Sequence, residues 1–504
     1  MSDHPDIEKL PLETYSIPVR ETIREIFRNP DNGAPDNISK AGCLALALRS
    51  NEVGGAARGY VVWNAWRSVF PVTGRPGNYC NVTDFENVDF RIEAINFSKF
   101  MFGDGARFQA AQWGNGASFT AAHWGNLANF QGAQWGEGAN FRGARWGDGA
   151  NFRGAQWGDF ADYRGAMWGD RANFESAVWS SYANFQGAQW DIGAKFEFAR
   201  WGILADFRGA QWVGGAEFCG TLWGDGADFQ GAQWASLRRV FLTEEKWEIA
   251  KQWANDQGAS PDSFGFMDFS GAEFQGKVDF SNRKFTATTR FVEGDLDKRP
   301  HCIFGSVPLF HGSELHQDTS FEGAVFPQAT GSDGAVSAYH TLKLAFSKQQ
   351  AVRKEQLFFR LEMVEERIGH WNKAKQAWRR SKLLAGFREG LTWILYKAYS
   401  LLSDYGFSVA RPLLLLVATW FLFASIYGSY SSGETVCVVW QPGCVLQETW
   451  LSYSLQQALP LTGFDKLKYA IENVPIGWLF IHKTLSLAAL FLIGLALRNL
   501  FKLK

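Results

Sequence analysis

The stretch ANFQGAQWGEGANFRGARWGDGANFRGAQWGDF, residues 128–160, repeats nearly the same eleven residues three times. The repeat extends well beyond this stretch, because tryptophan recurs at an unbroken spacing of eleven. The twelve positions are Trp113, Trp124, Trp135, Trp146, Trp157, Trp168, Trp179, Trp190, Trp201, Trp212, Trp223 and Trp234. A second aromatic series lies five residues before each tryptophan, with Tyr163 as its one departure from phenylalanine. Self-similarity at a fixed period is typical of repeat architectures.

Composition excludes a helical interpretation of this period, although right-handed coiled coils also repeat every eleven residues. Each unit has two or three glycines, and a glycine inside a helix costs about 1 kcal/mol relative to alanine. Short extended segments fit better, because alternate residues of a strand face the same side. Ala133 and Trp135 would then share one face, and the polar residue between them would face solvent. Gly147 and Gly149 suit corners that need positive φ.

The units A-N-F-Q-G and A-[DN]-[FY]-R-G resemble the pentapeptide repeat, A-[DN]-[LF]-x-x. The resemblance implies an all-β, right-handed quadrilateral β-helix with about five residues per side. In that family the central large residue and the small residue two positions before it point inward. Here a five-residue unit alternates with a six-residue unit, so one coil would take about 22 residues, with Phe and Trp on alternate sides. We place the extra residue after each Trp in a widened corner.

The aromatic columns could instead face solvent, as a stacking surface for sugars, lipids or bases. The shared Ala-x-aromatic pattern favours the interior, where burial of each ring would contribute on the order of 2–3 kcal/mol. The predicted core ladder includes Phe130, Trp135, Phe141, Trp146, Phe152 and Trp157.

The repeat region has distinct flanks. Residues 1–78 are predicted to form an N-terminal helical cap. Within them, the W-N-x-W-R segment at 63–67 resembles a segment that often precedes pentapeptide repeats. The β-helix is predicted over 79–330, with an irregular helical insertion at 235–263 where the period breaks.

The remaining residues change character. Residues 335–405 predict a basic helical neck that ends in an interfacial helix, and 408–504 predict a transmembrane domain. Its two apolar spans, at about 412–429 and 476–497, are long enough to cross a ~30 Å hydrocarbon layer at about 1.5 Å per residue.

The neck carries twelve basic and four acidic residues between positions 343 and 388. Beside a membrane span, such a segment is attracted to anionic headgroups by about 1 kcal/mol per charge close to the surface. The alternative is an ordinary solvated helix face. The candidate membrane-surface residues are Arg379, Arg380, Lys382 and Arg388.

Lys and Arg residues precede the first span and follow the second span. The positive-inside rule therefore predicts that both termini are cytoplasmic. The junctions at 403–412 and 454–460 resemble membrane-bound pentapeptide-repeat proteins of bacteria, which implies a multi-pass protein of the bacterial inner membrane. Cys437 and Cys444 would then lie on the outer side of the membrane, where disulfides can form. The sequence leaves open whether these two cysteines form one.

Two spans around a semi-apolar segment, 450–464, also resemble a two-helix channel with a pore loop. The re-entrant or pore-like candidates are Gln456, Gln457, Pro460, Thr462 and Gly463. The segment lacks the T-V-G-Y-G motif whose carbonyls replace the hydration shell of K⁺. An interfacial or re-entrant helix without conduction is the favoured interpretation.

No catalytic or metal-binding constellation is evident, so we expect neither enzymatic activity nor a cofactor. The net charge is −1, and residues 104–234 hold thirteen acidic and nine basic residues with interleaved signs. This balance argues against a nucleic-acid partner and against the DNA mimicry of gyrase-interacting members of the family.

The function predicted from the sequence is a non-enzymatic, membrane-anchored β-solenoid. It would act as a scaffold or in partner recognition at the cytoplasmic face, contacting membrane lipids and an unknown protein on the β-helix surface. The alternative is an oligomeric two-span, ion-channel-like protein with a cytoplasmic solenoid sensor. Whether the chain forms a homo-oligomer stays open.

Overall fold

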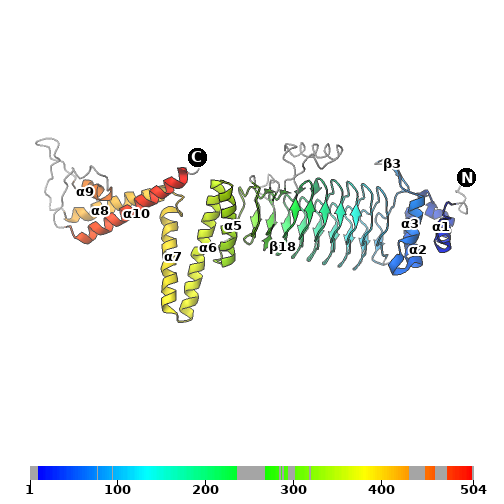
Figure 1. Cartoon of the computed structure of the whole chain (residues 1–504), viewed down its shortest axis with the longest axis horizontal. Coiled ribbons are helices and arrows are strands. Elements are labelled where there is room, and N and C mark those ends of the chain that lie inside the picture. Colours follow the sequence, from blue (N-terminus) through cyan, green and yellow to red (C-terminus); the bar gives the residue numbers. More distant parts are fainter. Residues whose placement is uncertain are drawn as a thin grey trace. The chain divides into compact units, whose positions relative to one another are not determined.

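The computed structural model comprises two compact units, Met1–Gln328 and Ala329–Lys504. The first contains N-terminal helices and a parallel β-solenoid, and the second contains helices (Figure 1). The structure describes residues 10–75, 78–92, 95–234, 267–282, 285, 289–292, 301–316, 319–327, 329–430, 449–459 and 474–501. The predicted insertion at 235–263 therefore lies outside the described residues.

Each tryptophan-containing coil of the solenoid takes 22 residues, as the pairing register shows. Trp135 pairs in parallel with Trp113 and Trp157, each 22 residues away. Trp168 pairs in the same way with Trp146 and Trp190 on another side of the coil. The predicted fold class, a β-solenoid followed by helices that include two apolar ones, is confirmed.

The strands are very short, and each contributes one rung to a parallel sheet. A nine-stranded sheet has the order β24-β21-β17-β14-β11-β9-β7-β6-β5, and a five-stranded sheet has the order β19-β15-β12-β10-β8. The strands of the nine-stranded sheet are β5 (Asp89–Phe90), β6 (Gln112–Trp113), β7 (Gln134–Trp135), β9 (Gln156–Trp157), β11 (Val178–Trp179), β14 (Arg200–Trp201), β17 (Leu222–Trp223), β21 (Glu273–Phe274) and β24 (Ile303–Phe304). Those of the five-stranded sheet are β8 (Arg145–Trp146), β10 (Met167–Trp168), β12 (Gln189–Trp190), β15 (Gln211–Trp212) and β19 (Gln233–Trp234).

Smaller sheets complete the solenoid and its N-terminal end. The order β13-β16-β20-β23 and the pair β18-β22 are parallel, whereas the pairs β1-β2 and β3-β4 are antiparallel. Their bounds are β1 (Gly33–Ala34), β2 (Asn37–Ile38), β3 (Thr73–Arg75), β4 (Asn78–Cys80), β13 (Ala194–Lys195), β16 (Ala216–Glu217), β18 (Ala227–Asp228), β20 (Met267–Asp268), β22 (Val278–Asp279) and β23 (Thr289–Arg290).

Aromatic ladders fill the interior of the solenoid. The rings of Trp135 and Trp157 stack with centroids 4.9 Å apart and an interplanar angle of 2°. Phe130 and Phe152 stack at 4.7 Å and 3°. The six residues of the predicted core ladder are at most 4 % exposed: Phe130, Trp135, Phe141, Trp146, Phe152 and Trp157. The alanines two positions earlier are also buried, so the Ala-x-aromatic pattern points inward.

The extra residue of the six-residue unit lies in the corner after tryptophan. Gly136 donates its N–H to the carbonyl of Trp113 in the preceding coil at 3.0 Å. A Cβ on Gly136 would lie 2.3 Å from Oδ1 of Asn115 and 2.8 Å from its backbone nitrogen. That Oδ1 also accepts the N–H of Glu137 at 3.0 Å. The corner is thus held by side-chain-to-backbone bonds between coils, and Gly136 lets them approach.

Thr221 replaces alanine two positions before Trp223, and the structure gives the reason. Its Oγ1 accepts the indole N–H of Trp223 at 2.9 Å and donates to the Phe218 carbonyl at 2.8 Å. Trp223 is the last tryptophan of its column, because Phe274 follows it in the sheet. Within the described part of the chain, eight buried indole N–H groups have no hydrogen-bond partner: those of Trp113, Trp124, Trp135, Trp146, Trp157, Trp168, Trp190 and Trp201.

Helix α3 (Val61–Val69) covers the first coils with the W-N-x-W-R segment. Trp63 is fully buried, and its Nε1 donates to the Met101 carbonyl at 2.7 Å. The Asn64 side chain accepts the Met101 N–H at 2.9 Å. Arg67 donates to the Asn81 carbonyl at 2.8 Å, and its burial lowers its pKa to about 10. The segment closes the hydrophobic end that a solenoid would otherwise leave open.

Among the described residues, two further helices complete the cap and six helices belong to the second unit. The cap helices are α1 (Ile17–Arg28) and α2 (Lys40–Arg58), joined by the 3₁₀ turn η2 (Pro30–Asn32). The second unit contains α5 (Asp333–Lys348), α6 (Val352–Arg379), α7 (Leu383–Ser403), α8 (Ala410–Tyr430), α9 (Thr449–Ala458) and α10 (Ile476–Phe501). Ser332 begins α5 as an N-cap that accepts the Ala335 N–H at 3.1 Å.

We expect Trp157→Ala to lower the free energy of unfolding by about 3–5 kcal/mol, because it removes a ring stacked on both sides and leaves a cavity. Denaturant unfolding followed by circular dichroism measures the change. Gln156→Ala is the matched control, since this neighbouring side chain is exposed and its loss should stay within about 0.5 kcal/mol. Equal losses of stability in the two variants would contradict the view that the stacked Trp157 ring stabilises the solenoid.

Candidate functional site

One corner of the solenoid displays apolar side chains where neighbouring coils have glycine. Phe160, Tyr182 and Leu204 occupy equivalent positions in successive coils and are 57 %, 41 % and 47 % exposed. Ile203, beside Leu204, is 43 % exposed. We call these four residues the corner strip. The rings of Phe160 and Tyr182 stack with centroids 4.8 Å apart and an interplanar angle of 8°.

The backbone is strained at three of the four residues of the corner strip. Phe160, Tyr182 and Leu204 have φ values of 61°, 64° and 57°, and a side chain in this left-handed region costs roughly 1–2 kcal/mol. The equivalent positions in the flanking coils are Gly138 and Gly226, with φ values of 69° and 80°. Bulky apolar residues are therefore kept where the fold favours glycine, and strain of this kind concentrates at functional sites.

Sequence reasoning missed the corner strip, although a signal was present. The residue before alanine in this corner is Gly138 in one coil and Gly226 four coils later. Phe160, Tyr182 and Leu204 hold this position in the three coils between them. The break becomes visible only when the sequence is aligned at 22 residues instead of eleven.

The four candidate membrane-surface residues lie together at the end of the α6–α7 hairpin. Arg379 is the last residue of α6, Arg380 and Lys382 lie in the turn, and Arg388 lies in the second turn of α7. All four are exposed. We call these four residues the basic tip. Arg388 forms an ion pair with Glu389 at 3.0 Å, and the charges of the other three residues are available to contact a membrane surface.

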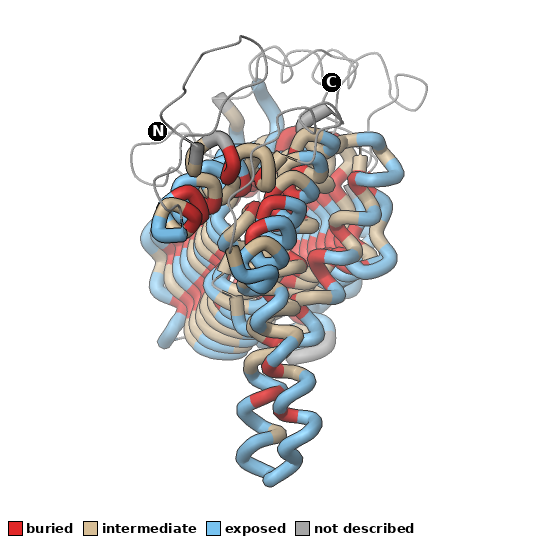
Figure 2. Tube along the Cα trace, turned by 90° about the vertical axis from the view of Figure 1, so that its left-hand side faces the viewer, coloured by how far each residue is buried: buried red, intermediate tan, exposed pale blue. Residues whose placement is uncertain are grey.

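Helix α7 exposes a row of large apolar side chains. Leu384, Phe387, Leu391, Ile394 and Leu395 are 88 %, 70 %, 47 %, 54 % and 62 % exposed. Spacings of three and four place them on one side of the helix, which we call the α7 apolar face. Much of the hairpin that extends downward in Figure 2 is exposed. An apolar face beside a basic tip is the pattern of a helix that lies in a membrane interface.

The opposite side of α7 is fixed on α6 by polar contacts. Nδ1 of His370 lies 2.7 Å from Oε2 of Glu389, and this hydrogen bond, helped by Arg388, lowers the pKa of Glu389. The hydroxyl of Tyr396 donates to Glu366 at 2.6 Å. The two helices are therefore held together without using the α7 apolar face.

Helices α8 and α10 are long and apolar enough to cross a membrane, over Ala410–Tyr430 and Ile476–Asn499. Only 22 % and 28 % of their most apolar windows are buried in the structure. Polar groups face inward: the hydroxyl of Tyr427 lies 3.0 Å from Nδ1 of His482, whose ring stacks on Phe423 with centroids 4.3 Å apart. Apolar outer surfaces around a polar interior are expected of helices in lipid.

Helix α9 packs against α8 through two hydrogen bonds. The Trp420 indole donates to the Leu451 carbonyl at 3.0 Å, and the Ser454 hydroxyl donates to the Trp420 carbonyl at 2.7 Å. Gln456 and Gln457, two of the pore-like candidates, lie near the end of this helix. The other three candidates, Pro460, Thr462 and Gly463, lie outside the described residues, as do Cys437 and Cys444.

The comparisons with known proteins identify the repeat. A family model of pentapeptide repeats matches residues 108–156 with nine copies. No curated protein and no solved structure matches the chain. Residues 108–156 of the β-solenoid therefore match pentapeptide repeats, which confirms the resemblance stated from the A-N-F-Q-G units. The chain also carries two helices that are long and apolar enough to span a membrane.

We expect Phe160→Gly to change the free energy of unfolding by less than about 1 kcal/mol. Glycine relieves the roughly 1–2 kcal/mol of left-handed strain, and this gain offsets the lost ring stacking and the greater freedom of the unfolded chain. Thermal and denaturant unfolding measure the change. Phe152→Gly is the control, because removal of its buried ring should lower the free energy of unfolding by at least about 3 kcal/mol. A similar loss for Phe160→Gly would show that the corner strip is structural.

We also expect Arg379→Gln combined with Arg380→Gln to weaken the contact of the hairpin with an anionic bilayer by about 2 kcal/mol, since each charge contributes about 1 kcal/mol. Hydrogen exchange of the amides at 383–391, in nanodiscs with and without phosphatidylglycerol, measures this contact. Arg145→Gln with Arg200→Gln is the charge-matched control on the solenoid. Exchange that does not respond to phosphatidylglycerol in the unaltered protein would refute the interfacial assignment.

Proposed function

We propose that this protein is a non-enzymatic, membrane-anchored scaffold that brings a protein partner to the cytoplasmic face of the bacterial inner membrane. The observation that carries the anchor is the apolar outer surface of α8 and α10, which stays mostly uncovered in the structure. Such surfaces are stable in lipid and would be a liability in water.

The α7 apolar face and the basic tip support the same conclusion. In Figure 1, α7 runs crosswise to α8 and α10, so a pair of helices along the membrane normal would leave α7 along the surface. Arg411, at the start of α8, donates to the Ser400 carbonyl near the end of α7 at 2.9 Å. This hydrogen bond links the two helices where the chain changes direction. Basic residues at this junction favour a cytoplasmic position for both termini under the positive-inside rule.

The corner strip supports partner recognition. Its four side chains are uncharged and largely apolar, and they interrupt a surface of Gln, Arg, Asn and Asp residues. A partner of matching chemistry would present an apolar patch, into which the Phe160 and Tyr182 rings could insert as anchors. Buried aromatic anchors of this kind dominate the energy of protein interfaces.

The second candidate function is an oligomeric two-span channel. The observation that favours it is the buried Oε1 of Gln456 on α9, which has no hydrogen-bond partner within the described residues. A neighbouring subunit or a hydrated ion could satisfy this atom. Currents across planar bilayers containing the purified full-length protein would favour the channel over the scaffold.

We expect a photo-crosslinking residue at Tyr182 to capture one defined protein in membranes that have been washed with alkaline carbonate. The Phe160→Gly exchange should reduce this capture about tenfold or more, which corresponds to about 1.4 kcal/mol. The same crosslinker at Gln189, an exposed residue of the five-stranded sheet, is the control.

Two outcomes would contradict the proposal separately. Release of the protein into the carbonate supernatant would refute the membrane anchor. Capture of the same protein with equal yield from Gln189 would refute recognition through the corner strip.

A further inference from the structure

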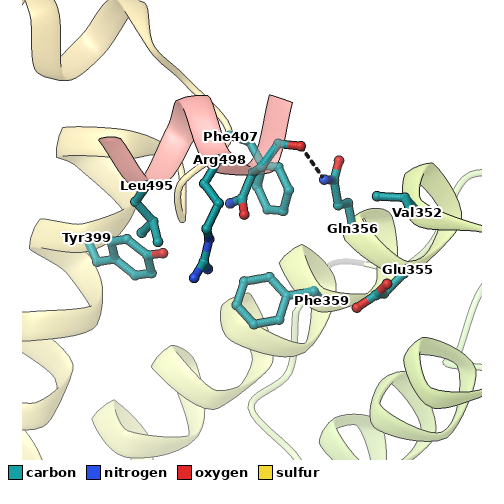
Figure 3. Close-up of a pocket in the computed structure, with 9 residues that line it drawn as sticks. Val352, Glu355, Gln356, Phe359, Tyr399, Phe407, Leu495 and Arg498 are labelled. Atoms are coloured by element: carbon teal, nitrogen blue, oxygen red, sulfur yellow. Dashed lines mark hydrogen bonds between the residues drawn. The ribbon is translucent and has the colours of Figure 1, made fainter. Parts of the chain in front are cut away.

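A cavity of about 180 Å³ lies where the end of α10 meets α6 and the loop before α8. Figure 3 shows Arg498 projecting into this space between the rings of Tyr399 and Phe359. Phe407 and Leu495 add apolar walls. The cavity therefore combines aromatic and apolar walls with charged and polar groups in about equal share, and such a combination can hold and orient a ligand.

The cavity has two charged residues, Arg498 and Glu355. Among the residues that the structure describes, neither Arg498 nor Glu355 has an ion-pair partner within the 4.0 Å that defines one. They do not pair with each other, although both line the same cavity. Other charges nearby are matched: Arg360 lies 3.1 Å from Asp404. One cation and one anion thus remain available at separate places in a single cavity.

The walls of the cavity are fixed by hydrogen bonds. The Gln356 side chain donates to the Asn499 carbonyl at 3.3 Å, and the Asn499 side chain donates to the Gly406 carbonyl at 3.0 Å. Gly406 has φ +86°, and a Cβ there would lie 3.0 Å from the hydroxyl of Tyr399. The loop is thus held tightly against α10, and the cavity is formed before any ligand binds.

The Tyr399 hydroxyl can act as a donor. Burial raises the pKa of Tyr399, and the charge of Arg498 opposes this shift. The phenol consequently keeps its proton at neutral pH and can donate to an anionic oxygen bound by Arg498. A guanidinium and a phenol on one side of the cavity suit a phosphate group, because guanidinium geometry matches phosphate oxygens.

The position of the cavity indicates where such a phosphate would come from. Arg498 lies in the last turn of the apolar segment Ile476–Asn499, so a span would bring its guanidinium to the headgroup level. Acyl chains could then run along the exposed side of α10, where Phe491 is 69 % exposed.

We propose that this cavity binds the phosphoethanolamine headgroup of a zwitterionic phospholipid, with Arg498 on the phosphate and Glu355 on the ammonium. A purely anionic headgroup would leave the Glu355 carboxylate without a counter-charge and would be repelled by it. A choline headgroup has no N–H to donate to that carboxylate, whereas a primary ammonium has three. The rings of Phe359 and Phe407 add favourable faces for a cation.

Titration of the full-length protein in detergent with short-chain phospholipids, read by native mass spectrometry, tests this inference. We expect phosphatidylethanolamine to be retained at least tenfold more tightly than phosphatidylglycerol or phosphatidylcholine. Arg498→Gln should weaken retention of phosphatidylethanolamine by at least tenfold. Glu355→Gln should abolish the preference over phosphatidylglycerol. The controls are Arg353→Gln, an exposed arginine of α6 outside the cavity, and Glu137→Gln on the solenoid.

A second arm separates the lipid from the free headgroup. The lipid source rests on the proposed membrane anchor, but soluble glycerophosphoethanolamine can enter the cavity without a bilayer. Binding of this compound that is lost in Arg498→Gln would support the cavity even if the carbonate wash removed the protein from membranes. Unchanged phosphatidylethanolamine retention in both Arg498→Gln and Glu355→Gln, or equal retention of all three lipids, would overturn the inference.

Discussion

The stacking of identical aromatic rings at a vertical spacing of one coil is the constraint on which the solenoid depends. Parallel strands set the distance between coils, and stacked planar rings fill that distance, as in the pairs Phe130–Phe152 at 4.7 Å and Trp179–Trp201 at 5.0 Å. A smaller residue would leave a void in the interior, and a differently shaped one would force the rings above and below it to tilt. Uniform size and shape at these positions therefore follow from close packing, and the conspicuous tryptophans identify the architecture and not a ligand.

The period and the family pattern were sufficient to predict most of the first unit. Alanine two residues before Trp135 indicated an inward face, the sum of a five- and a six-residue unit indicated a 22-residue coil, and W-N-x-W-R indicated a cap. The pairing of Trp135 with Trp157 and the contacts of Trp63 agree with these expectations. These features were predictable because each depends on local geometry that every coil repeats.

Other features depend on contacts between residues that are distant in sequence. Arg498 and Glu355 are separated by more than a hundred positions, and no local pattern indicates that they line one cavity. The role of Thr221 was likewise hidden, because its hydroxyl matters only where a tryptophan column ends. The corner strip was overlooked for a different reason: an eleven-residue alignment mixes two corners that face different sides.

The equivalence of the two half-coils has a consequence for how such a protein can change its length. Because each half-coil ends in the same Phe and Trp pattern, loss or gain of one eleven-residue unit would leave the interior continuous. It would, however, turn everything downstream by half a revolution relative to the α3 cap. The core would tolerate such an event while the corner strip came to face the opposite direction. Length variation in this architecture thus has an angular component, and a docking surface can be redirected without any substitution within it.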